Sequence, residues 1–485
     1  MRKQQILALI CLLLLLPCFI LPASANSAQQ HWTGTDASGA VITDGNSPII
    51  VEGEVLTFDI AEFPSNHYYD AESFSAYTAK VTAEYTFYNP SDMTVTATLA
   101  FPLGHLPGYA YNFGDFNTDN YSITVGGEEV ESRVRYTLSY SGKDFNLEED
   151  LPMLSDEYLT DDFYTPDLRI TAYKYEITDY DKNYSAANYG FDVSKNAGDG
   201  RVYYMPSQSG MHTQKDGDLR IHGWAKSTDS FVLYVFGNPL ESEIEWTFYQ
   251  NGGVEDDERI DGNISLVDTE VITLEEFALA NYTEDSGISK VDWFNAVITE
   301  LKASRESKDI PVLSLYGYDR NYSSQLLMWY QYEITLTPGE RITNTVTAPM
   351  YPGINMSYVP TIYNYTYLIS PASTWSEFGQ LKIVINTPYF MTECNLDGFS
   401  KTDNGYELTL DGLPTNGNGK HLDLIFTMST EENPVPRSQT PDGIVRGLIY
   451  LIAFGLPYLA IGIAVLVVGV VVIAISIAIF KKRRR

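Results

Sequence analysis

Residues 458–480 constrain this chain most, because they contain 23 consecutive residues without a charged side chain. A helix of that length can cross the hydrocarbon core of a bilayer, which is about 30 Å thick. The basic run 481–485 follows directly. Because Lys and Arg are retained on the cytoplasmic side, we expect a single-pass transmembrane helix with a cytoplasmic tail and an extracellular N-terminal part.

The first 25 residues agree with export. Arg2 and Lys3 precede the apolar run 6–21, and the triplet 23–25 reads Ala-Ser-Ala. This order of a basic segment, an apolar segment and a small-residue cleavage site is typical of a secretory signal peptide. The mature N-terminus is therefore expected outside the cell membrane.

Charge and cysteine content narrow the class of protein. The chain has 63 acidic and 31 basic residues, for a formal charge of −32, and this excess disfavours nucleic-acid binding. Of its three cysteines, Cys11 and Cys18 lie in the predicted signal peptide, which leaves Cys394 without a partner for an internal disulfide. A long exported chain without disulfides is typical of a Gram-positive bacterial surface protein.

The patterning of the exported part is mainly that of β-strands. Residues 79–88 alternate between apolar and polar side chains, and a turn sequence, Asn-Pro-Ser-Asp at 89–92, separates them from a second strand at 93–101. We expect these two strands to form a hairpin, and short strands at close spacing to build antiparallel β-sandwiches. Similar strand–turn patterns occur at 121–136, 331–348, 381–385, 406–410 and 421–428.

A small helical insertion interrupts the strands. Thr273 and Glu276 have the spacing of a capping box, and Ser289 with Asp292 indicates the start of a second helix. The second helix carries one apolar stripe, which we expect to pack against a sheet. The stripe consists of Val291, Phe294, Val297, Ile298 and Leu301.

These patterns predict two or more sandwich regions in sequence order, followed by a membrane anchor. A proline-containing stalk is expected to precede the apolar segment. The expected parts are a signal peptide (1–25), an N-terminal sandwich region (26–255) with an acidic loop (147–163), the helical insertion (256–310), a membrane-proximal sandwich (311–430), the stalk (431–447), an apolar segment containing the transmembrane helix (448–480) and the tail (481–485).

One part of the chain, around residues 79–130, has a recognisable motif order. A strand ends in Phe-x-Asn-Pro, a second ends in Phe-Pro-Leu, and an Ile-x-Val-x-Gly hairpin follows. The matching residues are Phe87, Asn89, Pro90, Phe101, Pro102, Leu103, Ile123, Val125 and Gly127. This segment resembles VIT-like β-domains (vault/inter-alpha-trypsin type). The resemblance implies a β-sandwich interaction module; the metal-binding Asp-x-Ser-x-Ser loop that often accompanies such domains is not found in this sequence.

Motifs for catalysis or cofactor binding are missing from the sequence. There is no His-Glu-x-x-His, no Gly-x-Ser-x-Gly and no P-loop, and the six histidines have no metal-ligand spacing. The acidic stretches 115–119 and 179–183 place oxygen ligands at alternate positions but lack the glycine and glutamate of a calcium loop. We interpret them as solvated turns and expect no enzyme activity, no cofactor and no defined metal site.

Aromatic residues give the remaining indication of function. The chain has 36 tyrosines, and several follow an asparagine, a combination that suits both sugar recognition and protein interfaces. A tentative binding surface consists of Tyr121, Tyr184, Tyr189, Tyr322 and Tyr365.

The sequence therefore predicts a membrane-anchored extracellular binding protein that acts in surface adhesion or protein–protein recognition. Its partner would be an extracellular protein or a cell-wall glycan. Two alternatives remain open: an extracellular subunit of a membrane complex, and a glycan-binding module of the cell wall. A secreted hydrolase has less support.

Overall fold

The computed structural model describes the following residues, to which every structural statement refers: 31–32, 36–38, 40–43, 47–64, 79–102, 121–138, 147–193, 200–214, 218–226, 229–250, 258–284, 287–306 and 326–441. Strands dominate these residues and form several sheets that are mainly antiparallel, with a few helices. The prediction of a mainly β fold is confirmed.

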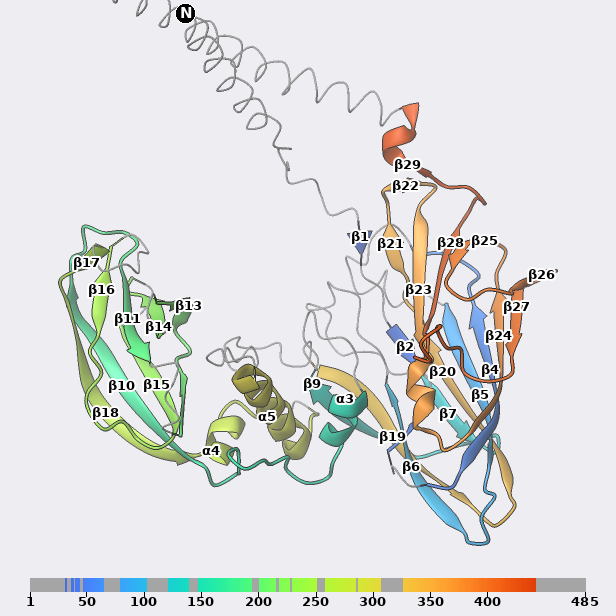
Figure 1. The fold of residues 1–485 in the computed structure, drawn as a ribbon, viewed down its shortest axis with the longest axis horizontal. Helices are drawn as coiled ribbons and strands as arrows, with labels where there is room; N and C mark the ends of the chain where they lie inside the picture. Colours follow the sequence, from blue (N-terminus) through green and yellow to red (C-terminus); the bar gives the residue numbers. More distant parts are fainter. Residues whose placement is uncertain are drawn as a thin grey trace, which may run out of the picture.

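Three sheets surround one hydrophobic core in the body drawn on the right of Figure 1. Sheet I has the order β26 (Ser400–Thr402), β27 (Gly405–Leu410), β24 (Phe378–Asn386), β4 (Ile50–Asp59), β5 (Lys80–Tyr88), β20 (Arg341–Pro349), β7 (Ser122–Val125), β8 (Glu128–Glu129). Sheet II has the order β1 (His31–Trp32), β21 (Gly353–Asn355), β23 (Ile362–Leu368), β28 (Leu424–Ser429), β25 (Phe390–Cys394), and β2 (Asp36–Ser38) also pairs with β23. Sheet III has the order β3 (Val41–Ile42), β6 (Val95–Pro102), β19 (Leu326–Leu336), β9 (Arg133–Leu138).

The hairpins predicted at 79–101 and 331–348 are wrong in their pairing, although their strands are present. β5 belongs to sheet I and β6 to sheet III, so the turn after β5 leads from one sheet to the other. β19 belongs to sheet III and β20 to sheet I, so the turn between them leads from sheet III to sheet I. The two strand pairs combine with each other, β5 with β20 and β6 with β19, in antiparallel register. We call each of these two-strand connections an arch.

The predicted hairpin at 121–136 is present only in its first part. β7 and β8 pair across Gly126 and Gly127, whose φ angles of 63° and 85° favour glycine. The chain then leaves sheet I and continues as β9 in sheet III. The sheets thus group residues 50–138 with 326–441, which differs from the division into the regions 26–255 and 311–430. Residues 147–306 lie between the two groups in sequence.

Asn89 joins the two arches through its side chain. The residue is fully buried, and its Nδ2 lies 2.8 Å from the carbonyl oxygen of Met93 in its own arch. The same amide donates to the carbonyl oxygens of Leu336 and Thr337, at 3.1 and 3.2 Å, in the other arch. Its Oδ1 accepts the backbone N–H of Ser91 at 3.0 Å, which fixes the orientation of the carboxamide.

The backbone completes this junction. The N–H of Asn89 donates to the carbonyl oxygen of Glu340, and the N–H of Gly339 donates to the carbonyl oxygen of Asn89. Residues almost 250 positions apart are thereby held at one end of the first body. The asparagine of the Phe-x-Asn-Pro motif therefore has a structural role.

A second body, drawn on the left of Figure 1, is a sandwich of two sheets with its own core. Sheet IV has the order β12 (Arg201–Tyr204), β15 (Ser230–Gly237), β10 (Arg169–Tyr180), β18 (Gly262–Thr273). Sheet V has the order β13 (Gln208–Thr213), β14 (Leu219–Trp224), β11 (Asn188–Val193), β16 (Thr247–Tyr249), β17 (Arg259–Ile260).

Helices α3 (Leu147–Met153), α4 (Leu274–Leu279) and α5 (Lys290–Glu306) lie between the two bodies in Figure 1. The predicted capping box is confirmed, because Thr273 and Glu276 exchange hydrogen bonds at the start of α4. Most of the predicted α5 stripe is buried, in a cluster with α4. The interpretation of 147–163 as an exposed acidic loop is wrong, since its first part forms α3.

The predicted stalk, 431–447, is in part attached to the first body. β29 (Val435–Pro436) pairs with β22 (Tyr358–Val359), and the N–H of Arg437 donates to the carbonyl oxygen of Ser357 at 2.6 Å. The predicted signal peptide and the 458–480 segment lie outside the described residues. Among the residues that are described, no helix has the length and apolar character needed to cross a membrane.

The Asn89 junction predicts a specific loss of stability. Asn89→Asp keeps the side-chain shape but removes the amide donor, which leaves carbonyl oxygens of the other arch unsatisfied. We expect the free energy of unfolding in a denaturant titration to fall by about 1–3 kcal/mol. Asn418→Asp, at an exposed turn position, should change it by less than about 0.5 kcal/mol. Equal effects of the two substitutions would contradict the assigned role.

Candidate binding recess and its polar network

Sheet III has an apolar and a polar face. Alternate residues of β19, such as Tyr332 and Ile334, belong to the core of the first body. Gln331 and Glu333 point the opposite way, because successive strand residues alternate between faces. Thr98 lies opposite Glu333 in β6. We call the face directed away from the core the outer face; around Gln331, Glu333 and Thr98 it carries polar side chains.

Helix α3 covers part of this outer face. Leu154, which follows the helix, forms a small apolar cluster with Ala100, Leu327 and Trp329 of sheet III. The indole N–H of Trp329 donates to Thr137 Oγ1 at 2.8 Å within the same face. These contacts attach the start of the 147–306 segment to the first body.

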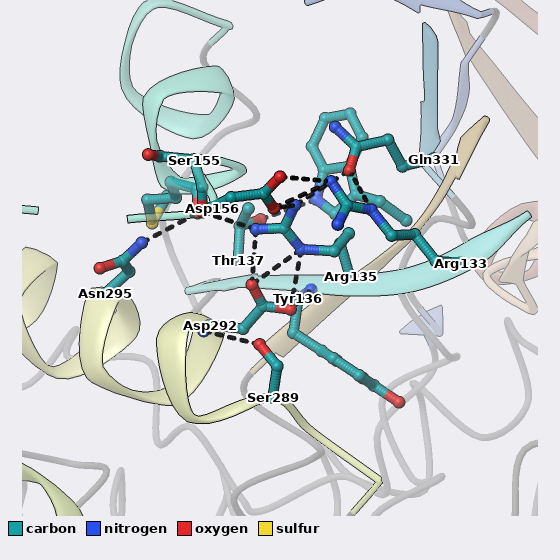
Figure 2. A network of polar contacts seen from close by, with 12 residues as sticks. Arg133, Arg135, Tyr136, Thr137, Ser155, Asp156, Ser289, Asp292, Asn295 and Gln331 are labelled. Carbon is teal, nitrogen blue, oxygen red and sulfur yellow. Dashed lines mark hydrogen bonds and ion pairs between the residues drawn. The ribbon is translucent and has the colours of Figure 1, made fainter. Parts of the chain in front are cut away.

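Arg135 of β9 is the centre of the polar network in Figure 2. Its side chain is only 4% exposed. The guanidinium donates from Nε to Asp292 Oδ1 at 2.9 Å, and from one terminal nitrogen to Asp156 and to Gln331. The other terminal nitrogen donates to the carbonyl oxygen of Ser155 at 2.7 Å and lies 2.8 Å from Asp292 Oδ1. One side chain thus connects sheet III, the segment after α3 and helix α5.

Asp292 is the buried anion of this network. Its side chain is fully buried and accepts the backbone N–H of Tyr136 at 3.0 Å in addition to Arg135. It lies in the first turn of α5, where the helix dipole favours a negative charge. The hydroxyl of Ser289 caps the same turn by accepting the N–H of Asp292. The predicted Ser289–Asp292 helix start is therefore confirmed.

A polar recess of about 890 Å³ opens beside this network, between the outer face of sheet III and the α3 segment. Its volume lies within the range of small-molecule sites in proteins. The recess is lined by Thr43, Thr98, Val130, Glu131, Ser132, Arg133, Leu151, Pro152, Leu154, Ser155, Asp156, Gln331, Tyr332 and Glu333.

The lining combines hydroxyl groups with three carboxylates and one guanidinium. Arg133 is already bonded within the lining, from Nε to Gln331 Oε1 at 2.8 Å and from a terminal nitrogen to Asp156. Arg133 and Arg135 together hold down the pKa of the Asp156 carboxyl, chiefly through the hydrogen bond from Arg133. Glu131 and Glu333 are exposed members of the lining. The recess therefore offers hydrogen-bonding groups and a net negative charge to a ligand.

The four described members of the predicted tyrosine surface do not come together as one exposed surface. Tyr189 and Tyr365 are buried in the cores of different bodies, so neither ring is open to a sugar. Tyr121 is partly buried beside Tyr330, and desolvation of its hydroxyl raises its pKa well above the usual value. Tyr184 packs against the core of the second body. Tyr322 lies outside the described residues.

The two acidic stretches considered for calcium have separate outcomes. Residues 115–119 lie outside the described part of the chain. In 179–183, Asp181 Oδ1 accepts the backbone N–H of Asn183 at 3.0 Å, as in a turn stabilised by an aspartate. No group of three or more His, Cys, Asp or Glu residues within the described ranges is close enough together to hold a metal ion.

A second polar group, Glu54, is buried inside the first body. It is 3% exposed and points from β4 into the core beside Tyr85 and Tyr367. Burial raises the pKa of its carboxyl to about 7, while the two tyrosine hydroxyls act in the opposite direction. Sequence reasoning missed this residue because Glu54 and Tyr367 are brought together only by the packing of sheet I on sheet II.

The network predicts unequal effects of its two carboxylates. Asp292→Ala removes the buried partner of Arg135, and we expect the free energy of unfolding to fall by about 3 kcal/mol. Asp156→Ala removes a carboxylate whose side chain is 66% exposed, and the loss should stay below about 1 kcal/mol. Denaturant titrations of both variants measure the difference. A loss from Asp156→Ala as large as that from Asp292→Ala would contradict the assignment.

Glu54 predicts a pH dependence of stability. Below pH 4.5 its carboxyl is protonated in both the folded and the unfolded chain, and its contribution is fully present. As the pH rises from 4.5 to about 7, the unfolded chain has released this proton while the folded protein still holds it, so stability is lost over this range. The loss assigned to this group is at most about 3 kcal/mol.

The measurement compares wild type with Glu54→Gln across this pH range. Because the amide cannot ionise, the variant should gain stability relative to wild type between pH 5 and pH 8, and the difference isolates Glu54 from other carboxyls. A pH-independent difference would show that Glu54 does not titrate with a raised pKa.

Comparisons with known proteins do not place this chain in a family. No family model and no curated protein matches it. A crystal structure of a Legionella pneumophila protein, provisionally described as nutrient-binding, overlaps with a TM-score of 0.31 and 9% identity, over 82% of this chain and 72% of the other. At this TM-score the overlap carries no conclusion about fold or function.

Proposed function

We propose that this chain is an extracellular binding protein of a Gram-positive cell surface, anchored by residues 458–480. The observation that supports a binding role is the recess on the outer face of sheet III, with its volume of about 890 Å³ and its polar lining. Export and anchoring are supported by the signal-peptide pattern and by the uncharged segment with its basic tail.

The lining favours a small ligand that carries hydroxyl groups and a positive charge. Both arginines near the recess are engaged with Asp156 or Asp292. Glu131 and Glu333 are exposed carboxylates of the lining, which can accept hydrogen bonds from an ammonium group. Amino sugars combine the two features, and they are the ligand class that we propose. This choice also fits the cell-wall glycan partner expected from the sequence.

The attachment of residues 435–437 to β22 supports a position close to the membrane. A free stalk would begin at residue 431, whereas here the chain remains bound to the first body as far as Arg437. The segment that links the first body to the proposed transmembrane helix is therefore shorter than the predicted stalk by these residues.

Calorimetric titration of the full-length protein in detergent tests the ligand class. We expect glucosamine to bind and glucose, which lacks the amine, to bind at least about tenfold more weakly. Glu333→Gln should weaken glucosamine binding about tenfold, or about 1.4 kcal/mol. Glu84→Gln is the matched control, because Glu84 is an exposed glutamate of β5 that does not line the recess.

Two results would contradict the proposal. One is the absence of saturable binding by either sugar. The other is the same loss of affinity from Glu84→Gln as from Glu333→Gln, which would indicate a general effect of charge.

A further inference from the structure

The edges of the described sheets are short, with one exception. The edge strands β1, β3, β8, β9, β12, β13, β17, β25 and β26 have two to six residues each. β18 has 12 residues and lies at the edge of sheet IV, where β10 is its partner. Short edge strands limit unwanted pairing with other chains, so a long edge strand is the place where another strand can add.

The two faces of β18 differ in character. Val271 lies opposite Thr171, and Leu266 opposite Tyr175. Tyr175 belongs to the core between sheets IV and V, so Leu266 and Val271 are on the inner face. Both remain open to solvent nevertheless, with exposed fractions of 41% for Leu266 and 54% for Val271. The core between sheets IV and V therefore does not fully cover the inner face of β18.

The outer face of β18 is acidic. Asp268 lies opposite Lys174, and Glu270 opposite Ala172. Both carboxylates belong to exposed residues. The usable edge therefore has apolar side chains on one face and negative charge on the other. A register shift at Val267 separates this stretch from the first half of the strand.

The free backbone groups can be located from two hydrogen bonds. The N–H of Thr269 donates to Asp268 Oδ1 at 2.8 Å, and the N–H of Thr273 donates to Glu276 Oε2 at 2.7 Å. These N–H groups therefore do not serve the ladder with β10. Since outward and inward groups alternate in an antiparallel ladder, Val271 between them also directs its N–H and C=O away from β10.

We propose that residues 268–273 of β18 form a docking site for an extended segment of a partner protein in which apolar and basic residues alternate. The segment adds to sheet IV as a further strand and pairs with the outward backbone groups of Val271. Its apolar residues lie beside Val271 on the inner face, and its Lys or Arg residues lie beside Asp268 and Glu270. This site is separate from the recess on sheet III and does not depend on it.

Charge argues against a second copy of this chain as the occupant. Two β18 strands in antiparallel pairing would bring their acidic residues, Asp268 and Glu270, to one face of one edge, and like charges on facing strands are destabilising. The whole chain has a formal charge of −32, which adds general repulsion between copies. The same charge attracts a basic segment.

The test uses the full-length protein in detergent and synthetic peptides about as long as β18. One peptide alternates valine with lysine, a second alternates valine with glutamate, and a third has the valines and lysines in separate blocks. We expect binding of the alternating valine–lysine peptide alone. Hydrogen exchange should show new protection at the N–H of Val271 in that complex and no change at β9.

Two substitutions at Val271 separate backbone pairing from side-chain chemistry. Val271→Pro removes the outward N–H without removing a bond to β10, and it should abolish peptide binding while leaving the thermal midpoint within a few degrees of wild type. Val271→Thr keeps the N–H and should retain binding. Equal binding by these two variants would overturn the proposal.

Glu270→Lys tests the charge without altering the edge backbone. This substitution should lower the affinity for the valine–lysine peptide roughly fivefold and raise the affinity for the valine–glutamate peptide. Unchanged affinity for both peptides would overturn the proposed partner chemistry. A concentration-dependent dimer in sedimentation that Val271→Pro abolishes would assign the edge to a second copy and would also overturn it.

Discussion

The carboxamide of Asn89 is the contact on which the first body depends. It is fully buried and reaches carbonyl oxygens of both arches, so the turn after β5 and the turn after β19 are held as one unit. With these turns in place, β5 pairs with β20 and β6 with β19, and sheets I and III face a common core. The two halves of the chain can therefore bury their apolar faces only together, because each arch supplies the edge that the other needs.

The pairing of the two arches also determines where the recess lies. β9 and β19 are neighbours in sheet III, and the whole 147–306 segment lies between them in sequence. The segment must leave and re-enter at the same sheet, and the Arg135–Asp292 pair fixes helix α5 against that point. The recess forms where α3 approaches the outer face without filling it. Its walls thus come from the insertion itself and from the chain before and after it.

The sequence was informative where structure is determined locally. Strand positions, the glycine turn at Gly126 and the capping box at Thr273 depend on neighbouring residues, and all are present. Strand pairing was mispredicted because β5 pairs on one side with β20, some 250 residues away, and nothing in an alternating pattern specifies which edge it will meet. The recess was missed for the same reason, since its lining comes from five separate stretches of chain. The tyrosines were overinterpreted because strand cores use the same residue type.

Charge gives the two proposed sites a common physical basis. In the recess, both arginines are satisfied by carboxylates and a backbone oxygen, so the charged groups that the lining offers to a ligand are the exposed Glu131 and Glu333. On β18, the acidic face stands beside free backbone groups and exposed apolar side chains. Both proposed sites would therefore favour positively charged partners, one a small molecule and the other an extended chain. Neither kind of site needs a contiguous sequence motif, since ordinary polar residues acquire their role only when the sheets place them together.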